Sequence, residues 1–238
     1  MWAPGDFISA LISLAQLYFI FYAEILKPPH SGPCAPEVLV RVIAGAKKGV
    51  DLRCGHGPFF RPTAQIVKGS LFSTVGGELE GALVVDLFAG SGAVGIEALS
   101  RGASRVIFVE QDSRIMKALR SNLERCGFGP DVAKVRLGDA IRILERAARN
   151  GDFFDIIFAD PPYEGKTAQK VVDTVAGSGS PLCRLLVVEH GNPVFVKEEG
   201  PLELAKTRRF GRTVLSYFLY RKEVGDGAGK DGALPGDV

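Results

Sequence analysis

A short apolar run ends in an acid, two prolines and an aromatic residue, a combination of side chains that can do chemistry. Residues 156–165 read IIFADPPYEG, so Asp160 directly follows a strand-like segment. Pro161 and Pro162 fix φ and lack an N–H, which leaves a rigid backbone rich in hydrogen-bond acceptors. Asp160 and the Pro161 carbonyl can accept the two hydrogens of an amine, and Tyr163 can stack on a planar ring. The segment predicts a site for a flat group that carries an amine.

A glycine-rich loop lies about 70 residues upstream, after another apolar segment. It reads DLFAGSGAVG, in which Gly90, Gly92 and Gly95 form a GxGxxG pattern that a nicotinamide-binding enzyme would also show. Asp86, ahead of the glycines, would repel a pyrophosphate but suits the cationic amino group of S-adenosylmethionine. Glu110 follows Gly90 by 20 residues, the usual place of an acid that binds ribose hydroxyls. We expect Gly90 and Gly92 to let a ligand approach the backbone, and Gly95 to let helix and strand pack closely.

Strand and helix patterns alternate through the middle of the chain. Apolar runs predict strands at 82–88, 105–110, 133–139, 154–160 and 184–190. Helical patterns lie between the first four of these strands, at 91–102, 112–127 and 140–149. Residues 203–223 predict a β-hairpin that turns at Phe210-Gly211. The chain therefore predicts an α/β, Rossmann-like fold with a mostly parallel seven-stranded sheet and an antiparallel C-terminal hairpin strand.

Acidic residues recur where these strands end. The acids at or near strand ends are Asp86, Glu110, Asp139, Asp160 and Glu189. Because open parallel sheets bind ligands at the carboxyl ends of their strands, we expect these side chains to surround one site.

The two ends of the chain differ in composition from its middle. Residues 7–23 carry no charge, and 17 residues is at the short limit for a membrane span that no Lys or Arg precedes. A membrane anchor, an extra helix and a misassigned start all fit residues 1–39, and we favour the misassigned start. Residues 225–238 are rich in Gly and Asp and are expected to be disordered. We expect residues 40–224 to form the working domain.

Positive charge gathers near the start of that domain. The chain has a net charge of +2, and residues 1–39 and 225–238 each carry −2, so residues 40–224 carry +6. The basic residues of 40–70 are Arg41, Lys47, Lys48, Arg53, Arg61 and Lys68, against Asp51 as the one acid. A basic arm over residues 40–60 suits a polyanionic partner, although a solvated basic face has the same composition.

Cysteine and histidine spacing gives no sign of a metal. The four cysteines form no CxxC pair, and the three histidines have no metal-ligand spacing. We therefore predict no metal, and the cysteine usage fits a reducing cytoplasm.

The motifs together resemble a known family. The DPPY segment resembles the (Asp/Asn)-Pro-Pro-(Tyr/Phe) signature of S-adenosylmethionine-dependent methyltransferases that act on nucleobase amines. From Arg41 to about Lys222, three-quarters of the chain resembles the bacterial small-subunit rRNA guanine-N2 methyltransferases of the RsmD type. The segments that carry the resemblance are RVIAGAKKG (41–49), RPT (61–63), DLFAGSGAVGIEALSRGA (86–103), VEQD (109–112), GDA (138–140), FADPPY (158–163) and FGRT (210–213).

The resemblance implies roles for individual residues. It implies a class I methyltransferase fold and N2-methylguanine in 16S rRNA as the product. In S-adenosylmethionine, Asp86, Gly90 and Gly92 would bind the methionine, Glu110 the ribose, and Asp139 with Ala140 the adenine. The other residues expected to bind this cofactor are Phe88, Ser91 and Gln111. Asp160, Pro161, Pro162 and Tyr163 would hold the target amine. Arg41, Lys47, Lys48 and Arg61 would contact RNA. The expected enzyme is a cytoplasmic monomer, not membrane-bound, that acts on an assembling small subunit.

The chain departs from the family after RPT, where it reads AQIVKGSLFS instead of an arginine-containing helix that ends in LFN. Lys68 takes the place of an arginine, Gly69 weakens a helix by about 1 kcal/mol, and Ser73 replaces an asparagine.

Three other functions fit parts of the pattern. An adenine-N6 methyltransferase of DNA or RNA would use the same DPPY chemistry. A nicotinamide-dependent oxidoreductase explains the segment from Gly90 to Glu110 but gives DPPY no role. A non-catalytic RNA-binding module explains only the basic arm.

Overall fold

The computed structural model describes residues 39–54, 62–162, 166–198 and 200–221. The predictions for residues 1–38, for the C-terminal tail and for Arg61 and Tyr163 lie outside these ranges. Residues 37–238 form a compact unit distinct from residues 1–36. Within the described ranges, none of the helices combines the length and apolar character that a bilayer crossing requires.

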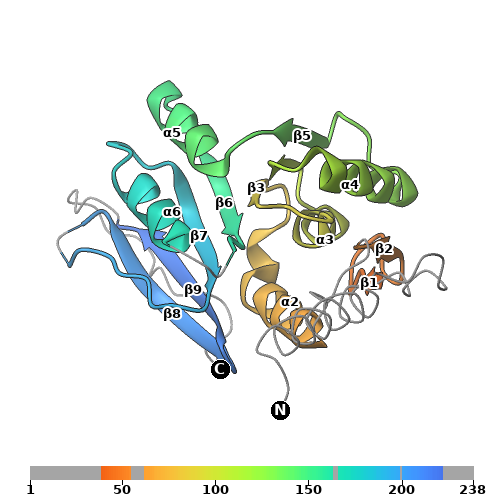
Figure 1. The fold of residues 1–238 in the computed structure, drawn as a ribbon, viewed down its shortest axis with the longest axis horizontal. Helices are drawn as coiled ribbons and strands as arrows, with labels where there is room; N and C mark the ends of the chain where they lie inside the picture. Colours follow the sequence, from red (N-terminus) through yellow and green to blue (C-terminus); the bar gives the residue numbers. More distant parts are fainter. Residues whose placement is uncertain (1–38, 55–61, 163–165, 199, 222–238) are drawn as a thin grey trace, which may run out of the picture. The chain divides into compact units, whose positions relative to one another are not determined.

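A seven-stranded sheet forms the centre of the domain (Figure 1). Its strands are β3 (Leu83–Leu87), β4 (Arg105–Glu110), β5 (Ala133–Leu137), β6 (Phe154–Ala159), β7 (Cys183–His190), β8 (Leu202–Phe210) and β9 (Thr213–Tyr220). The spatial order is β5-β4-β3-β6-β7-β9-β8. The first five strands are parallel, whereas β9 runs antiparallel to both β7 and β8. The predicted fold class is confirmed.

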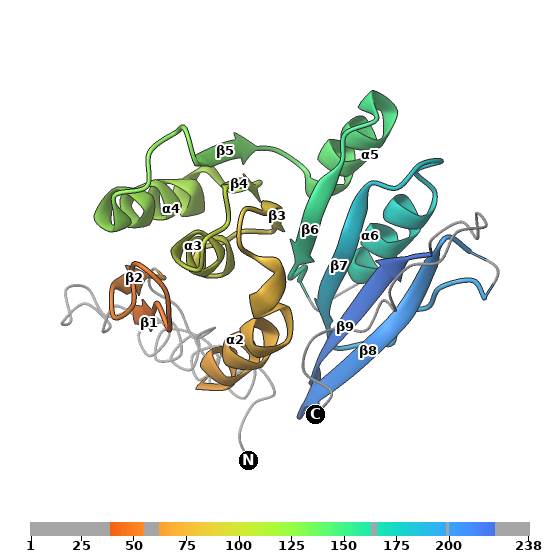
Figure 2. The same cartoon turned by 180° about the vertical axis from the view of Figure 1, so that it is seen from behind.

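Helices cover both faces of this sheet (Figures 1 and 2). They are α2 (Pro62–Val75), the short 3-10 helix η1 (Gly76–Glu78), α3 (Ala93–Ser100), α4 (Ser113–Cys126), α5 (Ala140–Asn150) and α6 (Thr167–Ala176). Successive strand residues point to opposite faces, so Val84 packs in the core with α2, α3 and α4, whereas Val85 packs in the core with α5 and α6. Both faces of the parallel strands are apolar for this reason.

Local sequence explains where the helices begin and end. Asp139 caps α5 by accepting a hydrogen bond from the Arg142 N–H at 2.9 Å, and Gly151 ends the helix with φ of 71°. The strand predicted over 133–139 stops at Leu137 because Asp139 serves as this cap. The C-terminal hairpin turns at Gly211 and Arg212, one residue later than predicted.

A small two-stranded sheet precedes the main one. It pairs β1 (Leu39–Arg41) with β2 (Asp51–Arg53) in antiparallel register. The residues predicted to form a basic arm thus include a hairpin, a feature that sequence reasoning missed.

Candidate active site

The chain reverses its direction of travel across the sheet between β3 and β6, and the site lies at this point. The strands that follow β3 extend the sheet on one side, whereas β6 and β7 extend it on the other. Leu87 pairs with Ala159, so Asp86 of β3 and Asp160 after β6 come from adjacent strand ends. Ligands of open α/β sheets bind at such a position. The structure brings Asp86, Asp160 and Glu189 close enough that Asp86 and Glu189 both act electrostatically on Asp160. Their service in one ligand site stays a prediction.

Asp86 is a buried acid that holds the start of α3. Its side chain accepts a hydrogen bond from the Gly95 N–H at 2.8 Å. Burial raises the pKa of Asp86 to about 7, the Gly95 hydrogen bond opposes this rise, and the charge of Glu110 adds to it. A buried carboxyl of this kind would be stabilised in its ionised form by a nearby cation. Asp86 therefore fits the amino group of an amino-acid ligand.

Glu110 joins the glycine loop to the end of β4. Its Oε2 accepts from the Gly90 N–H at 3.0 Å, and its Oε1 accepts from the N–H groups of Gln111 and Asp112 at 2.8 and 2.9 Å. The carboxylate thereby holds the backbone of the glycine loop at Gly90 and the backbone that follows β4 at Gln111 and Asp112. Its binding of ribose stays a prediction.

The three glycines of the loop have different surroundings. A Cβ atom on Gly90 would lie in nearly open space, which agrees with close approach of a ligand. Gly92 has φ of 81°, and a Cβ there would lie 2.3 Å from Leu119 Cδ1. Backbone conformation and packing therefore both favour glycine at this position, whether or not a ligand approaches. A Cβ on Gly95 would lie 2.3 Å from the Phe108 ring, which confirms the predicted helix–strand packing. Phe88 is the non-glycine residue with positive φ within the described ranges, at 61°, so the loop is strained where it leaves β3.

The other predicted cofactor residues lie around this loop. Gln111 and Asp139 are exposed, whereas Ala140 is buried. One Asp139 oxygen is used in capping α5, as described above. The Ser91 carbonyl accepts from Asn122 Nδ2 at 2.9 Å, and this buried amide also pairs with the backbone of Arg53. Asn122 was missed by sequence reasoning, because an asparagine within a helix pattern carries no signal of such a role.

Asp160 directly follows β6, at the position where the target amine is expected to bind. Asp160 is exposed to solvent as a residue, yet protein atoms around its carboxyl and the negative charges of Glu189 and Asp86 raise the pKa of that carboxyl well above its usual value. Pro161 is buried and Pro162 is exposed. A carboxyl with a raised pKa is a better proton acceptor than an ordinary aspartate.

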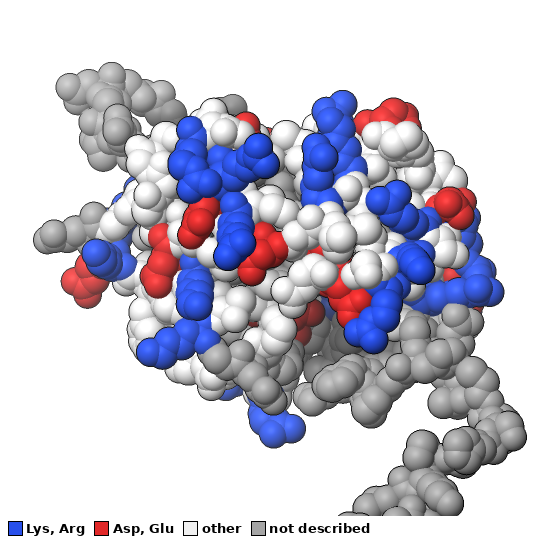
Figure 3. All heavy atoms as spheres, turned by 45° about the horizontal axis from the view of Figure 1, so that its top comes forward, with Lys and Arg blue, Asp and Glu red and all other residues white. Residues whose placement is uncertain are grey.

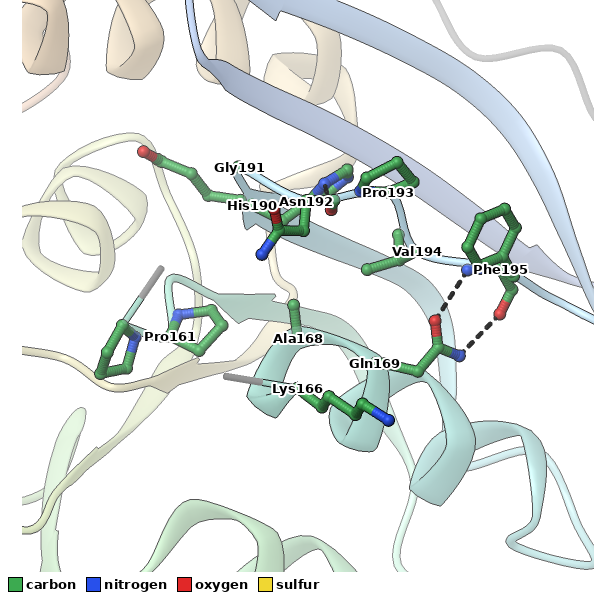
Figure 4. Close-up of a pocket in the computed structure, with 12 residues that line it drawn as sticks. Pro161, Lys166, Ala168, Gln169, His190, Gly191, Asn192, Pro193, Val194 and Phe195 are labelled. Carbon is green, nitrogen blue, oxygen red and sulfur yellow. Dashed lines mark hydrogen bonds between the residues drawn. The ribbon is translucent and has the colours of Figure 1, made fainter. Parts of the chain in front are cut away.

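A cavity of about 440 Å³ opens beside the two prolines. Its lining comes from β7 and the loop after it, from the start of α6 and from the DPP turn, and Figure 4 shows most of these side chains. Its volume is within the range of ligand pockets in proteins. The cavity is therefore large enough to admit a nucleobase beside Pro161 and Pro162, which follow Asp160.

The basic arm is fastened to the domain by α3. Glu97 is fully buried and accepts from the N–H groups of Ile43 and Ala44 at 2.7 and 2.9 Å. It also pairs with Lys68 Nζ at 3.2 Å and with Arg101 Nε at 2.8 Å. Lys68, which stands where the family has an arginine, is therefore held in a buried ion pair. Helix α2 runs continuously across Gly69 despite the low helix propensity of glycine.

The side chains predicted to bind RNA differ in whether they already contact other groups of the protein. Arg41 pairs with Asp51 at 2.7 Å, and Lys47 Nζ lies 5.6 Å from the centre of the Phe128 ring. Lys48 is exposed. RNA binding by these side chains stays a prediction. In the described part of the chain, no group of three His, Cys, Asp or Glu side chains could hold a metal ion.

Comparisons with known proteins give the family. The family model described as conserved hypothetical protein 95 matches residues 40–219. The Bacillus subtilis protein YlbH is 37% identical over 186 residues, which cover 77% of this chain and 99% of that protein. Ribosomal RNA small subunit methyltransferase D of Escherichia coli K12 is 30% identical over 203 residues, which cover 83% of this chain and 96% of that protein.

Solved structures agree with this result. The Escherichia coli protein yhhF matches with a TM-score of 0.67 and 26% identity, covering 78% of this chain and all of that chain. The fold extends to SMU.776, a structure with bound S-adenosylhomocysteine that is 15% identical, with a TM-score of 0.58. The chain therefore belongs to the conserved hypothetical protein 95 family and is an RsmD-type methyltransferase with the fold of S-adenosylmethionine-dependent enzymes.

Proposed function

We propose that this enzyme transfers a methyl group from S-adenosylmethionine to the exocyclic N2 amine of a guanine in small-subunit rRNA. The observation that carries the proposal is the placement of Asp160, with its raised pKa, at the end of β6 by the switch point of the sheet, followed by two prolines that line a cavity. The named relative from Escherichia coli, which acts on ribosomal RNA of the small subunit, supports the substrate class.

The methyl donor fits the residues around the glycine loop. When bound, S-adenosylmethionine supplies an electrophilic methyl group on a sulfonium. Asp86 would bind its amino group, because a cation relieves the cost of ionising a buried carboxyl. Gly90 would allow the backbone to approach the methionine moiety, and Glu110 would accept hydrogen bonds from the ribose.

The acceptor amine needs help, because its lone pair is delocalised into the purine ring. Asp160 would accept one N2 hydrogen and the Pro161 carbonyl the other, so that the lone pair turns toward the methyl group. A bond forms between N2 and the methyl carbon while the bond from sulfur to that carbon breaks. Asp160 can take the proton that N2 must lose, because its raised pKa makes it a competent base.

The basic arm would bring the RNA to the site. Arg41, Lys47, Lys48 and Arg61 would contact phosphates, and a partly assembled small subunit in the cytoplasm is the expected substrate for a monomeric enzyme. Backbone phosphates attract such side chains without regard to sequence.

Methyl transfer to small ribosomal subunits that lack the native modification tests the proposal. Labelled S-adenosylmethionine is supplied, the RNA is digested to nucleosides, and label is expected in N2-methylguanosine. Label in N6-methyladenosine would contradict the guanine assignment while leaving the amine chemistry in place. Absence of label from RNA, with S-adenosylmethionine bound, would contradict rRNA as the substrate.

A further inference from the structure

The loop after β7 forms one wall of the cavity and is anchored at its start. His190, the last residue of β7, is buried, and its Nδ1–H donates to the Asn192 carbonyl at 2.6 Å. Its Nε2 therefore accepts from the Ser216 hydroxyl of β9 at 2.8 Å. Burial lowers the pKa of His190, which favours the neutral ring that this pattern needs. The first turn of the loop is thus fixed to the sheet.

The loop is anchored again at Phe195 by a side chain from α6. Gln169 Nε2 donates to the Phe195 carbonyl at 2.8 Å, and Gln169 Oε1 accepts from the Phe195 N–H at 2.9 Å. Figure 4 shows both hydrogen bonds on the Phe195 backbone. Gln169 Nε2 also donates to Asp173 Oδ1 at 2.8 Å, which orients the amide. One side chain therefore holds both polar groups of the Phe195 backbone.

The Phe195 side chain itself is left in solvent. It is 71% exposed, the highest value among the exposed large hydrophobic side chains of the described residues. Five other phenylalanines are buried in the core (Phe72, Phe108, Phe154, Phe158 and Phe218). An aromatic ring on a fixed backbone loses little conformational freedom when it binds a partner. The exposure of the Phe195 ring on a fixed backbone favours a role in binding a ligand over a role in packing the domain.

The position of Phe195 relates it to the cavity. The wall near the DPP turn is formed by Pro161 and Pro162, and the loop contributes Pro193, Val194 and Phe195. Figure 4 shows Phe195 at the end of the lining that is remote from Pro161. A base whose amine reaches Asp160 would occupy the part near the prolines, so the Phe195 ring is left for another base.

The neighbouring hairpin adds positive charge to this end of the sheet. Val214 pairs with His190 on one side and with Arg209 on the other, so the tip of the β8–β9 hairpin adjoins the end of β7. Arg208, Arg209 and Arg212 of this tip are exposed. These arginines lie beside the start of the loop that carries the exposed Phe195 ring. Cationic side chains and exposed aromatic rings are both typical of surfaces that bind single-stranded nucleic acid.

We propose that Phe195 stacks on a base of the substrate RNA that flanks the target guanine, and that Gln169 is the positioning residue for this ring. The inference rests on the proposed function, since it takes RNA as the substrate. Splaying and stacking of unpaired bases on aromatic side chains is the usual route to recognition of RNA loops. The flanking base would be held at the rim while the target amine reaches Asp160.

Three substitutions of Phe195 separate stacking from simple apolar contact. Phe195→Tyr keeps the aromatic face, Phe195→Leu keeps apolar volume without a ring, and Phe195→Ala removes both. We expect kcat/KM for unmethylated small subunits to be near wild type in the tyrosine variant and roughly ten-fold lower in the other two, mainly through KM. The Kd for S-adenosylmethionine should be unchanged in all three. Wild-type kcat/KM in the leucine or alanine variant would overturn the proposal.

A double-mutant cycle tests the role of Gln169. Gln169→Ala removes both hydrogen bonds to the Phe195 backbone without adding charge beside Asp173, so we expect a several-fold rise in KM with an unchanged Kd for S-adenosylmethionine. The same substitution in the Phe195→Ala background should have no further effect, because the ring that it positions is gone. Additive effects would overturn the positioning role. Wild-type enzyme that fails to methylate the subunits would instead refute the proposed function, so the two failures are distinguishable.

Discussion

At the scale of single residues, the site depends on carboxyl groups that are held close together. Asp86, Asp160 and Glu189 come from three neighbouring strands. Burial and the charge of Glu110 raise the pKa of Asp86, whereas the surrounding protein atoms and the charges of Glu189 and Asp86 raise the pKa of Asp160. A bound sulfonium and ammonium would offset this repulsion. The charges of ligand and site are thus complementary. Without the ligand, repulsion between the carboxylates lowers the stability of the folded protein.

Replacement of Asp160 tests the amine-acceptor role. We expect Asp160→Ala to lower methyl transfer by about 100-fold or more, because it removes a hydrogen-bond acceptor and a base. The Kd for S-adenosylmethionine, measured by calorimetry, should stay near that of wild type. Asp152→Ala, which changes an exposed acid before β6, is the matched control and should behave as wild type. Near-normal turnover by Asp160→Ala would contradict the role.

Asp86 should make the stability of the ligand-free protein depend on pH. Its pKa is about 7 in the folded state, against about 3.9 when unfolded. Its contribution to stability is fully present below about pH 4 and is lost as the pH rises to 7, because the unfolded state ionises more easily. The free energy of unfolding of wild type should therefore fall by up to about 4 kcal/mol over this interval from this group.

Urea unfolding at pH 5 and pH 8 measures this effect. Asp86→Asn has no charge to lose, so its free energy of unfolding should change less between the two pH values than that of wild type. The Asp152→Asn control should follow wild type. An equal pH dependence in wild type and Asp86→Asn would show that burial does not perturb the pKa of this carboxyl.

Asp86→Ala should also lose binding of S-adenosylmethionine.

At the scale of elements, α3 joins two parts of the molecule. Its N-terminal end carries the glycine loop of the site, and its buried Glu97 binds the turn between β1 and β2 and Lys68 of α2. Ser100, at the end of α3, adds hydrogen bonds to Ala44 and Lys47. The arm and the cofactor loop are thus fixed to the same short helix.

Removal of Glu97 should weaken the whole assembly. Glu97→Ala leaves Lys68 buried without its carboxylate partner, although Lys68 Nζ still donates to the Arg41 carbonyl. We expect a loss of about 3–5 kcal/mol in the free energy of unfolding. Glu124→Ala, on the exposed side of α4, is the matched control and should cost less than about 0.5 kcal/mol. Urea unfolding measures both variants. A loss below 1 kcal/mol for Glu97→Ala would mean that the buried ion pair contributes little.

At the scale of the whole molecule, basic and acidic residues nearly balance. Figure 3 shows basic side chains across the face that it presents, with acidic ones between them. The chain has 29 basic and 27 acidic residues, so its net charge of +2 cannot by itself direct RNA to the site. Orientation must come from where the exposed cations stand relative to the cavity.

The salt dependence of the reaction tests this view. We expect kcat/KM for small subunits to fall as salt rises, and Lys48→Glu to lower it at low salt while reducing the slope by about one. Lys134→Glu changes the charge equally, on the edge strand β5, and should have a smaller effect. Equal effects of the two substitutions would mean that the arm has no special part in binding RNA.

The sequence by itself determined the architecture and the acids of the site. Apolar periodicity and proline chemistry act over a few residues, so the strands of the main sheet, helices α3, α4 and α5, and the acid-proline turn at Asp160 could be predicted. Helix α6 and the β1–β2 hairpin were missed. Tertiary structure alone decided the long-range pairs. Asn122 reaches a residue 69 positions away, Glu97 one 54 positions away, and Gln169 one 26 positions away. Such pairs follow no local pattern, because only the folded chain brings the partners together.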